Sequence, residues 1–110
     1  MDKQLSALMR AMIRYDAGDA RRIQHLVKVH DFAATIAAAE NIVGEERLTL
    51  EAAAILHDVG IHAAEAKYGD CSGKHQEELG PEEARKVLEE VGGFSTSPVS
   101  YTISEPTRPY

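Results

Sequence analysis

The chain has little cysteine, few aromatic residues and no long apolar run. Its single cysteine, Cys71, cannot form an intrachain disulfide, which fits a reducing compartment. Aromatic residues make up only 5% of the chain, so alanine and leucine must fill the interior, which favours closely packed helices. No segment approaches the ~18 to 20 apolar residues that cross a membrane, and charged residues interrupt the N-terminus where a signal peptide would be apolar. We therefore expect a soluble, cytoplasmic protein.

Basic residues are also too few for a nucleic-acid backbone to be the main partner. The 12 Lys and Arg residues face 18 Asp and Glu residues, which gives a net charge of -6. Neutralising a phosphate backbone requires clustered cations. A small phosphorylated molecule remains a possible ligand if a metal ion and a few nearby cationic side chains bind its phosphate. The 110 residues are enough for one domain with a single modest core.

Apolar spacing predicts two helices in the first part of the chain. The first carries one apolar stripe and should end at Gly18, and its stripe consists of Leu5, Leu8, Met9, Met12 and Ile13. The second should span residues 20–41 with Asp19 as its N-cap. The stripe expected to face the core contains His25, Val29, Phe32 and Ile36. His30 lies about 140° round this helix from His25, so we expect it to pack or to face solvent instead of sharing an ion.

Two further helices are predicted after residue 49. The first, LEAAAILHDV, should be capped by Thr49 and end near Gly60, and its alanines allow neighbouring helices to approach closely. Residues 61–80 are polar and contain three glycines, which indicates a surface excursion. Pro81 is expected at the first position of a helix that runs to Val91 and stops at Gly92-Gly93.

The remaining segment has no helical period. It contains four Ser, three Thr and three Pro in FSTSPVSYTISEPTRPY. We therefore predict an all-α bundle of about four to five helices in residues 1–93 and an irregular tail in residues 94–110.

The most informative feature is the His57-Asp58 pair at the end of an apolar run. Burying an imidazole beside a carboxylate is costly, and a cation that stabilises the carboxylate explains the pair. One alternative is that Asp58 ends a helix and His57 is a core histidine. His25, in the apolar stripe of the preceding helix, favours a metal site built where two helices converge. A structural site is a weaker alternative because there are no clustered cysteines.

These residues resemble the HD-domain superfamily of metal-dependent phosphohydrolases. The likeness covers residues 19–93, and its matching segments read RRIQHLVKVHDFA, AAAILHDVGI and KYGDCSGKHQEELGPEEARKVLEEVG, the last similar to a small prokaryotic subgroup. The resemblance implies an HD-like helical fold with His25, His57 and Asp58 as ligands of a divalent ion (Mn, Fe, Zn, Ni, Co or Mg). It also implies that Asp58 polarises the attacking water.

One departure from the family pattern concerns the fourth ligand. Family members carry a further aspartate on a later helix, whereas the last aspartate here is Asp70, in an expected loop. We therefore expect the C-terminal part with that ligand to be missing. Glu105 or a residue of a second copy can be considered as a substitute, and a homodimer that covers exposed core edges is expected.

Several other residues are candidates for the reaction. His75 is a candidate proton donor to a leaving group, or a solvent-exposed loop histidine. His62 can line the pocket or lie on the surface. Cys71, with no histidine beside it, is not expected to be a nucleophile. The candidate cations for a substrate phosphate are Lys74, Arg85 and Arg21, with Arg22 beside the last.

The sequence thus predicts a metal-dependent phosphohydrolase that acts on a small phosphorylated compound, with a nucleotide as the substrate class. The alternative is a degenerate, non-catalytic HD module that binds a metal, a nucleotide or a protein partner. No membrane partner is expected.

Overall fold

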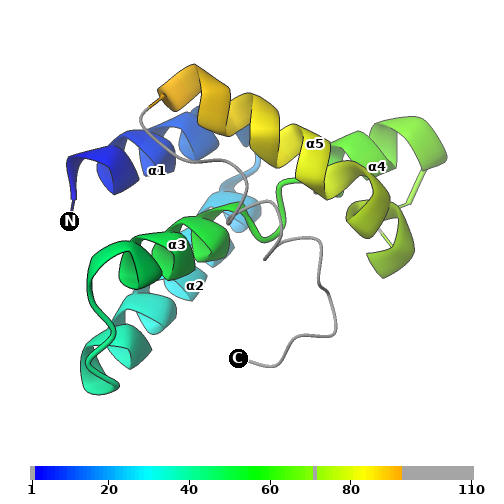
Figure 1. Cartoon of the computed structure of the whole chain (residues 1–110). Helices are drawn as coiled ribbons and strands as arrows, with labels where there is room; N and C mark the ends of the chain where they lie inside the picture. The colour runs from blue at the N-terminus through cyan, green and yellow to red at the C-terminus, as the bar shows by residue number, and fades with distance from the viewer. Residues whose placement is uncertain (1, 71, 93–110) are drawn as a thin grey trace.

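The computed structural model describes residues 2–70 and 72–92, which form five α-helices and, within those ranges, no strand (Figure 1). The predicted all-α fold is confirmed. The expectations about Cys71 and the tail of residues 94–110 lie outside the described residues. In order, the helices are α1 (Lys3–Tyr15), α2 (Ala20–Ala39), α3 (Gly44–Leu56), α4 (Ile61–Tyr68) and α5 (Gly73–Val91).

Helix α1 lies between α3 and α5, while α2 lies alongside α3 and α4 packs against α5 (Figure 1). The shared core is made by the apolar faces of α1, α3 and α5 with one leucine of α2. Its largest fully buried side chains are Leu8, Ile55, Leu56, Val59 and Leu88. Each such side chain stabilises the fold by ~1.5–3 kcal/mol through burial. This core holds the end of α3 against α1 and α2.

The second helix begins as predicted. The side chain of Asp19 accepts a hydrogen bond from the backbone N–H of Arg22 at 3.2 Å, which satisfies one of the free donors of the first turn. Its apolar stripe is not where the sequence placed it, because Phe32 is 67% exposed and Ile36 is 58% exposed. The buried positions are Leu26, His30 and Ala37. The buried face is shifted by one residue, about 100° round the helix, because α3 is the main neighbour of α2.

The third helix begins earlier than predicted. It starts at Gly44, so Thr49 is an interior residue and not a cap. Glu45 and Glu46 lie in the first turn, where negative charge favours the helix N-terminus. The preceding Val43 makes no side-chain cap, so the start has no cap residue that the sequence could reveal.

The predicted surface excursion over residues 61–80 is wrong. It contains α4, which ends at Gly69 in the left-handed conformation (φ 77°), and the first turns of α5. Ser72 caps α5 by accepting a hydrogen bond from the backbone N–H of His75 at 3.4 Å. Pro81 therefore lies inside α5 and not at its start. Because Pro81 has no backbone N–H, α5 lacks one intrahelical hydrogen bond there, and the helix continues on both sides of it. The predicted end at Gly92 is confirmed.

None of the helices in the described ranges is both long and apolar enough to span a membrane.

Gly60, two residues after Asp58, lies against the backbone of α5. A Cβ at this position would be 3.0 Å from both the Cα and the N of Gly80, and 3.1 Å from the carbonyl O of Gln76. Its backbone conformation (φ -79°) suits any residue, so the requirement is one of space. This contact fixes the turn that carries Asp58 against a neighbouring helix.

We expect Gly60→Ala to lower the free energy of unfolding by ~1–3 kcal/mol, because backbone must move to admit the methyl group. The matched control is Gly73→Ala, where a Cβ would have no atom within 4 Å and the helix gains propensity. Urea unfolding monitored by circular dichroism measures both. Equal stabilities of the two variants would contradict the close contact.

Candidate metal centre

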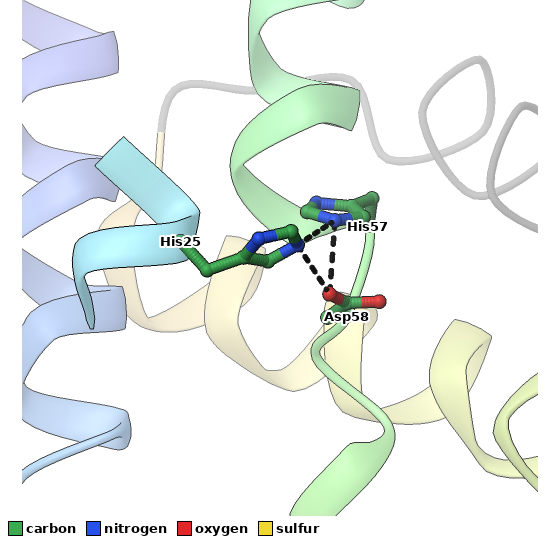
Figure 2. A group of neighbouring side chains, drawn as sticks. All are labelled: His25, His57 and Asp58. Carbon is green, nitrogen blue, oxygen red and sulfur yellow. Dashed lines mark hydrogen bonds and ion pairs between the residues drawn. The ribbon is translucent and has the colours of Figure 1, made fainter. Parts of the chain in front are cut away.

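Three side chains from two helices meet at one point (Figure 2). His25 comes from the first half of α2, and His57 and Asp58 follow the last residue of α3. The Nε2 of His25 lies 3.3 Å from the Nε2 of His57 and 3.2 Å from Oδ2 of Asp58. The third distance, between the Nε2 of His57 and Oδ2 of Asp58, is 2.9 Å. The predicted cluster of His25, His57 and Asp58 is therefore assembled in the structure.

The ring of His57 is held in one orientation by the helix that precedes it. Its Nδ1 lies 2.8 Å from the carbonyl oxygen of Ala54. Because a carbonyl only accepts, Nδ1 must donate its proton, and in the neutral ring Nε2 then presents a lone pair to the cluster. This backbone contact is the type that orients metal-binding histidines.

The spacing of the three atoms fits a single divalent ion. Ligands bound at ~2.1 Å are about 3.0–3.4 Å apart when the angle between them lies between about 90° and 109°. The three observed distances cover nearly this range. With Nδ1 protonated, the Nε2 of His57 and Oδ2 of Asp58 are both acceptors, and two acceptors 2.9 Å apart repel unless a proton or a cation lies between them. The donor set of two imidazoles and one carboxylate suits transition metals and leaves coordination positions open.

The same contacts shift the protonation of the pair. Burial lowers the pKa of His57, but the hydrogen bond and the charge of Asp58 outweigh it, so the pKa of His57 is raised. Burial raises the pKa of Asp58, but the hydrogen bond and charge of His57, with smaller contributions from His25 and Arg22, leave it below its ordinary value. Asp58 is therefore held as a carboxylate, the form that binds a metal ion.

The cluster opens into a small depression between α1, α2 and the turn after α3. Beside the three ligands it is lined by Asp16, Arg22 and His62, together with the apolar residues Met12, Leu26, Ile55 and Ile61. Its volume is about 10 Å³, which is close to the room that one water molecule needs. The described residues thus form a site with room for an ion or a water molecule, and not an enclosed nucleotide pocket.

The sequence allowed His62 either to line the pocket or to lie on the surface, and the structure places it at the depression. Its Nε2 lies 3.1 Å from Oδ1 of Asp16 and 3.7 Å from Oδ2 of Asp19. Asp16 was missed in the sequence, where it reads as an ordinary helix end. The only signal was its place three residues after Ile13, the last residue of the predicted apolar stripe, which does not distinguish it from a surface aspartate.

The other predicted site residues lie elsewhere. His75 is in the first turn of α5, with Nδ1 2.6 Å from Oδ1 of Asp70 and its ring stacked on Tyr68 at 3.9 Å between centroids. Arg85 forms ion pairs with Glu82 and Glu89 of its own helix. Neither these residues nor Lys74 and Arg21 line the depression, whereas Arg22 does. Their roles in catalysis and substrate binding stay predictions.

His30 is separate from this cluster. It is buried between α2 and α3, where its Nε2 lies 2.8 Å from Oε1 of Glu51. The expectation that His30 does not share an ion with His25 agrees with this position, and its packing role is confirmed.

Comparison with known families adds one finding. The family model described as the HD domain matches residues 22–108, which include all three ligand residues. The match continues beyond Gly93, where the likeness seen in the sequence ended, and the predicted domain boundary there stays a prediction. No curated protein and no solved structure matches the chain.

Proposed function

Since the chain belongs to the HD-domain family, we propose that it is a metal-dependent phosphohydrolase for a small phosphorylated compound, with a nucleotide as the substrate class. The observation that carries the proposal is the convergence of His25, His57 and Asp58 on one point at ligand spacing. Among the described residues no fourth His, Cys, Asp or Glu joins this group. Three protein ligands with open positions are typical of catalytic metal sites, whereas structural sites are closed.

Each of the three residues has a definite task in this proposal. His57 presents Nε2 because Ala54 holds its Nδ1 proton, and Asp58 supplies a carboxylate kept ionised by the neighbouring histidine. His25 is half exposed, which leaves the cluster open to solvent and to a substrate. A divalent ion bound there supplies a lowered pKa of coordinated water and partial neutralisation of phosphoryl charge.

Arg22 is the cation best placed to bind the phosphate. It lines the depression, and its positive charge favours the ionised forms of the carboxyl groups of Asp58 and Asp16. A guanidinium matches the geometry of phosphate oxygens through paired hydrogen bonds. Because the depression has room for little more than a water, the remainder of a substrate must lie outside it.

The test combines metal content with turnover. We expect the purified protein to hold about one divalent ion per chain by elemental mass spectrometry, as a single cluster of imidazole and carboxylate ligands requires. We also expect release of inorganic phosphate from one member of a nucleotide and sugar-phosphate panel in Mn²⁺, Co²⁺, Ni²⁺, Zn²⁺ or Mg²⁺. Bound metal without turnover in any ion would favour a non-catalytic module instead. The homodimer stays a prediction.

A further inference from the structure

A second polar pair lies on the same depression as the three ligand residues. His62, from the first turn of α4, and Asp16, from the end of α1, both line it. The Nε2 of His62 is 3.1 Å from Oδ1 of Asp16, and Asp19 lies farther from the same nitrogen at 3.7 Å. Because both carboxylates lie at Nε2, the second ring nitrogen, Nδ1, is the one left to act on another molecule.

The partner of this histidine is unusually buried for an aspartate. The side chain of Asp16 is 10% exposed, and burial raises the pKa of its carboxyl group although the charge of His62 opposes the rise. An ionised carboxylate in this position needs a hydrogen-bonded cation beside it. The side chain of His62 is 37% exposed and so remains accessible. A buried carboxylate behind a partly exposed imidazole is the arrangement that orients a histidine and stabilises its imidazolium form.

On the basis of the phosphohydrolase function proposed above, we infer that His62 is the general acid that protonates the leaving group and that Asp16 is its positioning residue. His75, the proton donor predicted from the sequence, lies in a separate cluster with Asp70 and Tyr68. His62 instead shares the depression with the residues expected to hold the phosphoryl group.

The proton balance of the step is simple. A water oxygen forms a bond to phosphorus as the bond between phosphorus and the leaving oxygen breaks. The leaving oxygen takes the proton from Nδ1 of the His62 imidazolium and departs as a neutral alcohol. The water retains one proton in the phosphate product and gives the other to solvent, from which His62 is protonated again. The carboxylate of Asp16 keeps its hydrogen bond to Nε2 throughout.

The experiment compares two substrates of nearly the same shape whose leaving groups differ in basicity. 4-Nitrophenyl phosphate releases an acidic phenol that needs no proton donor, whereas phenyl phosphate releases a phenol with a pKa of about 10. We expect His62→Gln to lower kcat/KM for phenyl phosphate at least about 100-fold, and for 4-nitrophenyl phosphate by less than about tenfold. The glutamine retains a donor toward Asp16 but cannot transfer a proton. Asp16→Asn should show the same selective loss, and Asp31→Asn, an exposed aspartate of α2, should show none.

The outcomes separate the two proposals. Unchanged metal content with selective loss on phenyl phosphate supports the assignment, because a merely structural role would lower both activities alike. Equal losses on the two substrates, or no loss, would overturn the general-acid assignment while the phosphohydrolase function stands. If the wild-type protein holds metal but hydrolyses neither substrate nor any member of the nucleotide panel, the proposed function fails and the assignment with it.

Discussion

Replacement of His57 by alanine is expected to abolish both metal binding and hydrolysis. The Nε2 of His57 lies 3.3 Å from the Nε2 of His25 and 2.9 Å from Oδ2 of Asp58. Its loss leaves one imidazole and one carboxylate. We expect metal affinity to fall at least about 100-fold, which is at the upper end of the loss seen when residues that only hydrogen-bond to metal ligands are mutated. Metal content by elemental mass spectrometry and phosphate release are the two measurements.

The effect should not come from unfolding. The side chain of His57 is 27% exposed, and its one backbone contact, to the carbonyl of Ala54, contributes only ~1 kcal/mol. Asp58→Asn provides a second test at the same point, and Asp31→Asn is the matched control away from it. A folded His57→Ala protein that still holds metal and turns over substrate would contradict the assignment of the site.

The metal cluster could be predicted from the sequence because its members carry local signals. His57 and Asp58 are adjacent and end an apolar run, and His25 lies on a helix whose start is marked by Asp19. Two of the three ligands are therefore fixed by the end of one helix, and only one contact between helices was needed to bring in the third. Family resemblance supplied the choice of His25 over His30.

The rest of the site depends on contacts between distant segments. Asp16 and His62 are far apart in the sequence and meet only because the turn after α3 packs against α1 and α5. Two helix starts were wrongly predicted for a different reason. Thr49 and Pro81 are residues typical of helix starts, yet packing on neighbouring helices outweighs that local preference at both positions. The exposed Phe32 and Ile36 show the same limit, since a stripe predicts a buried face only where a neighbour covers it.

A second large effect is expected at Glu51, a buried carboxylate of α3 that lies within an apolar stretch of the sequence. Its Oε1 lies 2.8 Å from Nε2 of His30 on α2, and its Oε2 accepts from Nε of Arg47 at 2.9 Å. The side chains of Glu51 and His30 are only 8% and 4% exposed. This group joins α2, which carries His25, to α3, whose last residue is followed by the other two ligands.

We expect Glu51→Ala to lower the free energy of unfolding by ~3 kcal/mol, because it leaves the Nε2 of His30 buried without its partner. Glu51→Gln keeps an oxygen that can accept from His30, so its loss should be nearer ~1 kcal/mol. Glu46→Ala, at an exposed glutamate in the first turn of the same helix, should lower stability by only ~0.5 kcal/mol through the lost interaction with the helix N-terminus. Urea unfolding of the three variants measures the differences. A Glu51→Ala protein as stable as Glu46→Ala would show that the buried pair does not join the helices, and that the position of His25 depends on apolar packing alone.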